Sequence, residues 1–256
     1  EIADGEAKGF SIKYAKKGDF TFTTISSDGG KTWSKPTPLN IENLRIISPY
    51  GRIITAPDGT LLMSVYGVPA GDDEAKDNVV YLIRSRDGGR TWGDESVVAH
   101  DYNETSFAFM PDGTLVAAAR NWSKGQFVSI LFSKDMGYTW SEPKQVTRNS
   151  EHPADLTLLQ SGKILLTFGR RARPMGCGAL ISEDGGKTWR YDKEILLAGD
   201  GIENGDLGYP STVQLDDGTI VTVLYYASGS EMAKGTCGWG DVSCQAIHYR
   251  EEDIAF

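Results

Sequence analysis

One eight-residue motif occurs four times in this sequence and constrains its fold more than any other feature. The copies share the pattern Ser-x-Asp-x-Gly-x-Thr-Trp and read SSDGGKTW (26–33), SRDGGRTW (85–92), SKDMGYTW (133–140) and SEDGGKTW (182–189). We call this motif the box. Successive box aspartates are 59, 48 and 49 residues apart. A period near 50 residues built of β-type segments is typical of a β-propeller, in which each repeat buries its faces against its neighbours.

A second landmark recurs in step with the box. It is a turn dipeptide between two apolar runs, found at Asp58-Gly59, Asp112-Gly113, Ser161-Gly162 and Asp217-Gly218. Such a dipeptide between alternating hydrophobic residues is a strong hairpin signal. One unit therefore consists of a strand (106–110), the turn, a second strand (114–120), a third strand (127–133) and a box that leads into a fourth. This pattern predicts the four-stranded blade of a propeller.

These units predict an all-β fold with a single propeller domain over residues 1–256. The expected blades are 1–47 (partial), 48–101, 102–150, 151–200 and 201–256 (partial). The first turn, Asp4-Gly5, precedes its box aspartate by 24 residues, so we expect the first blade to lack its inner strand. The last unit contains strands but no box. The count of about 18 strands indicates a segment of a larger propeller or an unusual closure.

The box itself is interpreted as a structural element. Its Asp can accept hydrogen bonds from backbone N–H groups of the turn, and its Gly can adopt a positive φ. Its Trp is a large apolar anchor with one N–H to satisfy. We expect structural roles for the box residues Asp28, Trp33, Asp87, Trp92, Asp135, Trp140, Asp184 and Trp189. The four tryptophan rings are expected to be buried between sheets.

Composition excludes several classes of function. The 256 residues include 26 Lys and Arg against 35 Asp and Glu, a net charge of −9, and no basic stripe of the kind that nucleic-acid binders carry. No apolar run approaches the roughly 18 residues of a membrane span. The cysteines, Cys177, Cys237 and Cys244, match no zinc-binding spacing. We therefore expect no nucleic-acid partner, membrane span, metal or cofactor; Cys237 and Cys244 either form a loop disulfide or remain thiols.

The hairpin turns give a common register for the strands that line the centre of a propeller. Eight positions before the turn stand Tyr50, Glu104, Pro153 and Tyr209. Eight positions after it stand Tyr66, Arg120, Gly169 and Tyr225. Residues at equal distances from a hairpin turn lie at the same end of its two strands. We therefore expect Glu104 and Arg120 to be neighbours at the end away from the turn, with Tyr209 at the same height two blades away.

These side chains have two interpretations. In the first, Glu104 and Arg120 form an ion pair within one blade, and Tyr209 is an aromatic residue packed at a strand start. In the second, Glu, Arg and Tyr converge at one level of the central channel and form a binding site. The segment GRRARP (169–174) adds three arginines in a chain of net charge −9, and is either a solvated loop or part of an anion pocket.

The sequence resembles the sialidase (neuraminidase) superfamily, whose members carry the box as Asp-box or BNR repeats. NETSFAFMPDGTLVAAAR (103–120) is similar to the sialidase segment that carries a Glu and then an Arg. GYPSTVQLDDGTIVTVLYY (208–226) is similar to the segment that opens with the nucleophilic Tyr. The order HPADL, GRRARPMG, SEDGGKTW, DLGYPSTVQLDDG is most similar to uncharacterised sialidase-like proteins. The resemblance implies a six-bladed propeller and a retaining glycoside hydrolase with a carbohydrate substrate. It favours a secreted or periplasmic protein, although the N-terminus EIADGEAKG shows no signal peptide.

Under this resemblance, Tyr209 would attack the anomeric carbon of the sugar and Glu104 would be the base that activates it. A phenol suits an anionic sugar, because a carboxylate nucleophile would repel it. Arg120 would be one of three arginines that grip the substrate carboxylate through paired hydrogen bonds. The further candidates for substrate binding are Arg171, Tyr50 and His152.

Parts of the family pattern have no counterpart in this sequence. The Phe-Arg-Ile-Pro motif with the first arginine is absent, and no Asp matches the family's acid/base position. The candidates for that role in a nearby loop, which no motif supports, are Asp72, Asp73 and Asp77. Gly178 stands where the third arginine is expected, so Arg171 or Arg173 is the candidate replacement. We therefore expect this chain by itself to be inactive on sialosides.

Two other functions fit the same sequence. Asp-box propellers also include non-catalytic proteins that bind glycans or other proteins, and a fold does not settle a function. A different sugar-cleaving reaction on the same scaffold would use His152 as acid or base, although a lone histidine is more often structural. Turnover of an aryl sialoside separates the hydrolase from the binding protein. A sugar-acid product with a new double bond would indicate a lyase.

Overall fold

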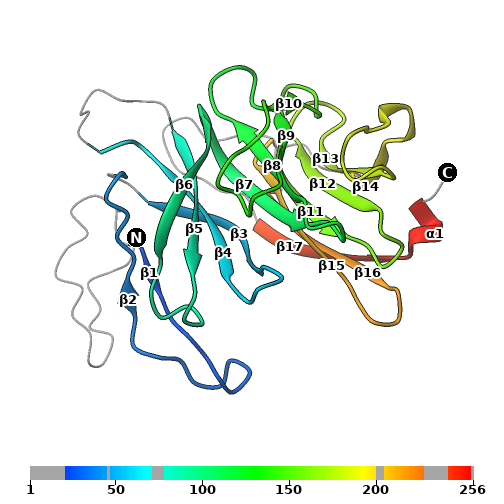
Figure 1. The fold of residues 1–256 in the computed structure, drawn as a ribbon. Helices are drawn as coiled ribbons and strands as arrows, with labels where there is room; N and C mark the ends of the chain where they lie inside the picture. The colour runs from blue at the N-terminus through cyan, green and yellow to red at the C-terminus, as the bar shows by residue number, and fades with distance from the viewer. Residues whose placement is uncertain (1–20, 45–46, 71–77, 200–204, 228–241, 255–256) are drawn as a thin grey trace.

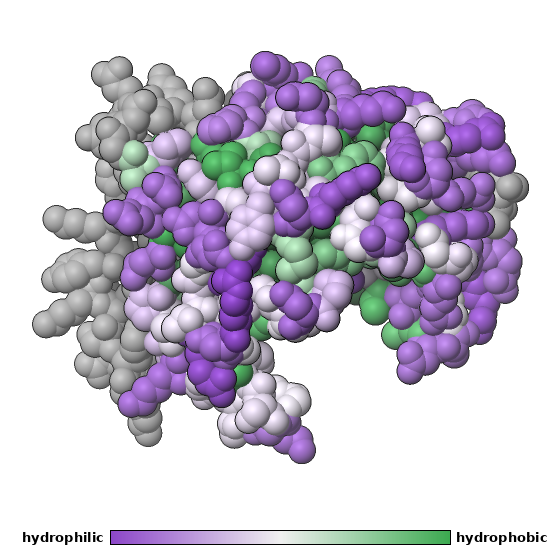
Figure 2. All heavy atoms as spheres, in the orientation of Figure 1, coloured by the Kyte–Doolittle hydropathy of each residue, from purple (hydrophilic) through white to green (hydrophobic). Residues whose placement is uncertain are grey.

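The computed structural model describes residues 21–44, 47–70, 78–199, 205–227 and 242–254. Within these ranges the chain consists of antiparallel β-sheets, one 3₁₀ turn at Tyr191–Lys193 and one short helix, α1 (Glu251–Ile254). Figure 1 shows the sheets side by side in chain order, and Figure 2 shows the same face with hydrophilic side chains over most of its outer parts. The prediction of an all-β protein is confirmed.

Each sheet is built from strands that follow one another in the sequence. The first sheet contains β3 (Ser48–Thr55), β4 (Leu61–Gly67), β5 (Val79–Ser85) and β6 (Gly93–His100). The second contains β7 (Tyr102–Phe109), β8 (Leu115–Asn121), β9 (Val128–Ser133) and β10 (Lys144–Gln145). The third contains β11 (Glu151–Leu158), β12 (Ile164–Arg170), β13 (Gly176–Ser182) and β14 (Ile195–Ala198). The fourth contains β15 (Leu207–Gln214), β16 (Ile220–Ala227) and β17 (Val242–Tyr249), and a ribbon of β1 (Phe22–Thr23) and β2 (Thr37–Pro38) precedes them all.

The first strand of each sheet lies toward the centre of the molecule (Figure 1). β3 contacts β7, β7 contacts β11, and β11 contacts β15, so strands from four different sheets lie side by side. The remaining strands of each sheet follow outward in chain order. This is the arrangement of blades around a propeller axis, and the prediction of a propeller is confirmed.

The hairpin between the first two strands of a sheet closes through a short, self-bonded turn. In the second sheet, the Met110 N–H donates to the Thr114 carbonyl at 2.8 Å, and Asp112 accepts from the Thr114 N–H at 2.9 Å. Gly113 has a φ of +83°, which explains the glycine at this position. The turn thereby fixes which residues of β7 and β8 lie opposite each other.

Strand β8 shows how the blades pack. Its Ala117 and Ala119 are buried against residues of β4 and β5, whereas Val116 and Ala118 are buried against residues of β11 and β12. Alternate residues of a strand face opposite sides of its sheet, so a strand that is covered on both sides has a continuous apolar sequence. The run LVAAA (115–119) is therefore the sequence of a strand between two neighbouring blades.

Each box is a hydrogen-bonded turn, as its composition predicts. In the third copy, Asp135 accepts from the Thr139 backbone N–H at 2.9 Å and from the Thr139 hydroxyl at 2.6 Å, and Trp140 Nε1–H donates to the Gly137 carbonyl at 3.0 Å. The same bonds recur in the other copies. Because the Thr139 hydroxyl and N–H stabilise the carboxylate, the pKa of Asp135 is lowered to about 2.

The box tryptophans are less buried than the sequence predicts. Trp92, Trp140 and Trp189 are half-buried at the edges of three core clusters, and Trp140 stacks on Phe107 with the ring centroids 5.6 Å apart. Trp33 is 62% exposed, so the prediction of burial between sheets is wrong for this residue. The described part of its blade is the ribbon β1–β2, and a two-stranded ribbon offers little surface for an indole ring to cover.

We predict that Trp140→Ala lowers the free energy of unfolding by about 3 kcal/mol, because it removes a large ring from the contact with Phe107. Trp33→Ala, at the exposed position, is the matched control and should change it by less than about 1 kcal/mol. Urea unfolding followed by circular dichroism measures both. Equal losses in the two variants would contradict the assignment of different packing roles.

Candidate active site

Three side chains meet at the end of the inner strands that lies away from the hairpin turns. Tyr209, on β15, donates its hydroxyl proton to Oε1 of Glu104, on β7, at 2.6 Å. Arg120, on β8, donates from Nη1 to Oε2 of the same carboxylate at 2.5 Å. Glu104 and Arg120 are 6% and 7% exposed, whereas Tyr209 is 36% exposed. The predicted contact between Glu104 and Arg120 is present, and the tyrosine joins it from two sheets away.

All four inner strands depart from regular pairing at this level. The pairing shifts between Tyr50 and Ile54, between Tyr102 and Thr105, between Glu151 and Ala154, and between Gly208 and Ser211. At each shift the inner strand contains more residues than its partner strand. Such extra residues bend a strand and change the direction of its side chains. Glu104 and Tyr209 both lie within these irregular stretches. The backbone can therefore direct them toward each other without following the regular alternation of a strand.

The backbone around Tyr209 adopts conformations that are rare for ordinary residues. Tyr209 has a φ of +50°, and Gly208 before it has a φ of +108°. A Cβ atom on Gly208 would lie 3.0 Å from Cα of Gly169 in β12, so the third and fourth sheets approach each other through two glycines. Strained positions of this kind persist where the surrounding structure fixes them, and they are common at functional sites.

The surroundings of the Tyr209 hydroxyl favour the protonated phenol. Burial, together with the hydrogen bond and negative charge of Glu104, raises the pKa of Tyr209 well above its ordinary value. Arg171 lies over the same ring, with its guanidinium carbon 5.6 Å from the ring centroid. The buried Nε of Arg171 has no hydrogen-bond partner among the described residues. The phenol thus faces a base, and an arginine with an unused donor lies beside it.

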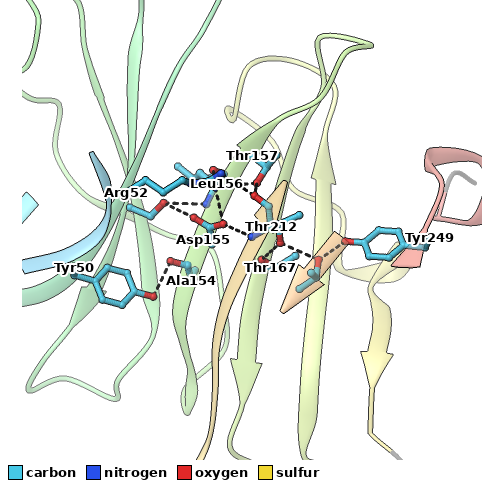
Figure 3. Close-up of polar contacts among 11 residues, drawn as sticks. Tyr50, Arg52, Ala154, Asp155, Leu156, Thr157, Thr167, Thr212 and Tyr249 are labelled. Carbon is cyan, nitrogen blue, oxygen red and sulfur yellow. Dashed lines mark hydrogen bonds and ion pairs between the residues drawn. The ribbon is translucent and has the colours of Figure 1, made fainter. Parts of the chain in front are cut away.

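Two further tyrosine rings flank Tyr209. Tyr225 stacks on it with the ring centroids 5.8 Å apart, and Tyr50 lies 6.1 Å away at a tilt of 59°. The Tyr225 hydroxyl donates to Asp206 at 2.5 Å, and burial together with this bond raises the pKa of Tyr225 to about 12. The Tyr50 hydroxyl donates to the Ala154 carbonyl at 3.3 Å (Figure 3). These two rings hold the Tyr209 ring in place.

The register taken from the hairpin turns is wrong for the first sheet. It places Tyr50 opposite Tyr66, but Tyr66 pairs with Ser48, and Tyr50 pairs with Ser64. The irregular stretch that begins at Tyr50 contains two more residues in β3 than in β4. A count from the turn cannot include such an insertion. Tyr50 nevertheless lies beside Tyr209.

His152, a sequence-based candidate for substrate binding or acid–base chemistry, is 1% exposed in β11. Burial, with the positive charges of Arg120 and Arg171, lowers the pKa of His152 from 6.5 to about 3. The ring is therefore neutral at neutral pH, and its Nδ1 has no hydrogen-bond partner among the described residues. His152 lies near the arginines but does not reach the exposed mouth of the site.

The arginines of segment 169–174 have different partners. Arg170 Nη1 lies 3.1 Å from a carboxylate oxygen of Glu194, and its Nε lies 3.7 Å from Glu151. Arg171 instead turns toward Tyr209, and Arg173 is exposed. The segment is therefore neither wholly solvated nor wholly part of the site.

Several other predictions concern positions around this site. A Cβ atom on Gly178 would lie 2.7 Å from the ring of Phe168, so an arginine does not fit there. Asp72, Asp73, Asp77 and Cys237 lie outside the described residues. The described residues contain no group of three or more His, Cys, Asp or Glu side chains placed to hold a metal ion. They also contain no helix long and apolar enough to cross a membrane.

Sequence reasoning missed Arg52 and Asp155, which lie one level below Glu104 along the inner strands. Arg52 donates from Nη2 to Asp155 at 2.7 Å and from Nη1 to the Thr212 carbonyl at 2.8 Å. Asp155 also accepts from Ser106 at 3.0 Å and from the Thr212 N–H at 2.7 Å (Figure 3). The available signal was a charged residue in each of two inner strands, with Gly51 marking the irregular backbone before Arg52.

Comparison with known proteins places this architecture in a family. The model of the BNR repeat-like domain matches residues 8–222. The chain belongs to this family. A sialidase of Bacteroides fragilis is 29% identical, with the match covering 81% of this chain and 39% of that protein. A sialidase of Clostridium perfringens is 28% identical, covering 78% of this chain and 62% of that protein.

Two solved structures resemble the chain as well. A Dyadobacter fermentans protein of unknown function superimposes with a TM-score of 0.74 at 28% identity, covering 90% of this chain and 64% of that one. A Hadza microbial sialidase superimposes with a TM-score of 0.65 at 23% identity, covering 92% of this chain and 45% of that one, which shows the shared fold. The chain spans between about two fifths and two thirds of the length of these four relatives.

We predict that His152 makes folding sensitive to acid. Because the pKa of His152 is lowered from 6.5 to about 3 in the folded protein, the unfolded chain takes up a proton at this residue more readily than the folded protein does. The free energy of unfolding is therefore highest above pH 6.5 with respect to this group, and it falls as the pH drops toward 3. Between pH 7 and 4.5, His152→Gln should therefore lose about 2 kcal/mol less unfolding free energy than the parent protein. The control is His100→Gln, at an exposed histidine, which should follow the parent. Parallel curves for the parent and His152→Gln would contradict the prediction.

Proposed function

We propose that the protein is a retaining glycoside hydrolase of the sialidase type, with Tyr209 as nucleophile and Glu104 as its base. The observation that carries this proposal is the carboxylate of Glu104, which accepts the Tyr209 hydroxyl at 2.6 Å and the Arg120 guanidinium at 2.5 Å. The relatives named sialidase support the same reaction class. The substrate class is a carbohydrate with a terminal acidic sugar.

The chemistry follows from the protonation states. The raised pKa of Tyr209 means that tyrosinate does not accumulate at neutral pH. The hydroxyl oxygen attacks the anomeric carbon while its proton passes to Oε1 of Glu104, and the leaving group departs with the electron pair of the glycosidic bond. Water then attacks the anomeric carbon and displaces the tyrosyl oxygen, which takes its proton back from Glu104, while the proton that water loses neutralises the leaving-group anion; this restores the phenol and retains the configuration. Because an unionised phenol carries no charge, an anionic sugar can approach it without repulsion.

Arginines supply the attraction for an acidic sugar. Arg120 donates one proton to Glu104 and, from Nη2, one to Gln126 at 3.2 Å, and each Nη nitrogen carries a second proton. Arg171 places its guanidinium over the Tyr209 ring, and its buried Nε–H has no hydrogen-bond partner among the described residues. Two guanidinium groups beside one nucleophile suit a substrate carboxylate, which arginine binds through paired hydrogen bonds.

We predict that Tyr209→Phe in the full-length protein lowers kcat on an aryl sialoside by at least about 1,000-fold, because the ring remains but the attacking oxygen is gone. Glu104→Gln should lower kcat by about 100-fold or more, since the amide cannot take the phenol proton. Release of the aryl group from a panel of glycosides, sialosides first, measures both. Thermal unfolding should show that Tyr209→Phe remains folded.

Tyr225→Phe provides the matched control, since it deletes a hydroxyl from the ring stacked on Tyr209 while the ring contact remains. Its hydroxyl bonds Asp206 rather than Glu104, so kcat should stay within about threefold of the parent. If Tyr209→Phe turns over as fast as the parent, the nucleophile assignment is wrong. If the full-length parent cleaves no glycoside in the panel, a glycan- or protein-binding propeller replaces the hydrolase.

A further inference from the structure

A buried carboxylate joins four inner strands next to the candidate active site, on the side nearer the hairpin turns. Asp155, on β11, is 4% exposed. It accepts from the Ser106 hydroxyl of β7 at 3.0 Å, from the Thr212 N–H of β15 at 2.7 Å, and from Arg52 Nη2 of β3 at 2.7 Å. Figure 3 shows Asp155 between Arg52 on one side and Thr212 on the other. One side chain thus bonds to the first strand of each of the other three sheets.

The bonds around Asp155 leave these strands little freedom to move apart. The Ser106 hydroxyl, which donates to Asp155, also accepts from the Leu156 N–H at 3.1 Å. Arg52 donates to the Leu156 carbonyl at 3.0 Å and to the Thr212 carbonyl at 2.8 Å. The bonds therefore close into rings that run between neighbouring strands, rather than forming a single chain of contacts.

A buried charge of this kind needs an explanation other than stability. Burial raises the pKa of Asp155, and Arg52 offsets this only in part. Apolar residues of similar volume often stabilise a core as well as or better than a buried ion pair does. What a directional hydrogen-bond network adds is a fixed geometry between the elements that it joins.

Two of the strands that Asp155 joins carry the proposed catalytic pair. Glu104 precedes Ser106 by two residues on β7, and Tyr209 precedes Thr212 by three residues on β15. These strands belong to the second and fourth sheets, with β11 of the third sheet between them. The 2.6 Å bond from Tyr209 to Glu104 therefore depends on the spacing of two sheets that are not adjacent.

We infer that Asp155 is a positioning residue, which sets the separation between Glu104 and Tyr209 by bonding to Ser106 and Thr212. Arg52 holds the carboxylate in this role. Its catalytic consequence rests on the proposed function, but its geometric consequence does not. A displacement of about 1 Å at a reacting group can lower a rate by about 100-fold, so an indirect residue of this kind has a measurable effect.

The test uses two variants that weaken the network and one that does not. Asp155→Asn keeps the side-chain volume but replaces one acceptor oxygen by a donor. Ser106→Ala keeps the Asp155 carboxylate but removes the two bonds of the Ser106 hydroxyl, to Asp155 and to the Leu156 N–H. The control is Thr167→Val, which removes a buried bond of 3.1 Å between Thr167 and Thr212 without touching Asp155. All three variants lose buried hydrogen bonds, so unfolding free energies show whether the losses of stability are comparable.

The first readout is the distance from Tyr209 Oη to Glu104 Oε1 in crystal structures of the full-length variants. We expect it to exceed about 3.5 Å, beyond hydrogen-bond range, in Asp155→Asn and Ser106→Ala, and to remain near the parental value in Thr167→Val. If Asp155→Asn does not fold, Ser106→Ala decides the outcome. A parental distance in every folded variant would overturn the inference, since Asp155 would then contribute stability alone.

The second readout is turnover of the sugar that the parent cleaves. Asp155→Asn and Ser106→Ala should lower kcat by about 10- to 100-fold with KM within about threefold, whereas Thr167→Val should leave both unchanged. An unchanged kcat in both network variants would overturn the inference. If the distance lengthens but the parent cleaves no glycoside, the positioning role stands and the proposed hydrolase function fails.

Discussion

The candidate site depends on the hydrogen bonds that the carboxylate of Glu104 accepts. It is buried, and it receives a phenol from one sheet and a guanidinium from another strand of its own sheet. Placing a carboxylate in the interior is unfavourable unless charged and hydrogen-bonded partners surround it. Removing either partner would therefore leave the buried Glu104 carboxylate without one of its hydrogen bonds, which is unfavourable. The positions of Arg120 and Tyr209 thus depend on that of Glu104. The hydrogen bond from Tyr209 also places a proton acceptor beside its side-chain hydroxyl oxygen.

The propeller scaffold makes this meeting possible. Neighbouring blades cover both faces of the second sheet, as the burial of β8 on both sides shows. This packing holds the inner strands at fixed spacings around the centre. The irregular stretches at the start of each inner strand then turn individual side chains toward one another. Below them, the bonds from Asp155 to Ser106 and Thr212 join the two strands that carry the tyrosine and the glutamate. Regular packing supplies the frame, and local irregularity supplies the site.

Much of this arrangement could be predicted from the sequence because it follows from local signals. The box and the Asp-Gly turns repeat with a period that is typical of propeller blades. Glu104 and Arg120 are equally far from one turn, and this predicted the contact that they make. The predicted register was wrong where a strand contains extra residues, as after Tyr50. Counting positions from the turn assumes that both strands have the same number of residues, and the sequence does not show where one strand has more. It also missed the pair of Arg52 and Asp155, which are 103 residues apart in the sequence. The exposure of Trp33 was missed because a motif specifies its own turn but not what its ring will cover.

The most direct test of the account is to trap the sugar on Tyr209. The full-length protein would be incubated with a 3-fluorosialosyl fluoride. Its ring fluorine destabilises the oxocarbenium-like transition states and so slows formation and hydrolysis of the glycosyl–tyrosine intermediate, while the anomeric fluoride leaves without strong acid assistance. Digestion and mass spectrometry then locate the added mass. The account predicts one fluorosialosyl group on the peptide that contains Tyr209, and none on that peptide in Tyr209→Phe. A stable adduct on Glu104 or on any other residue would contradict it.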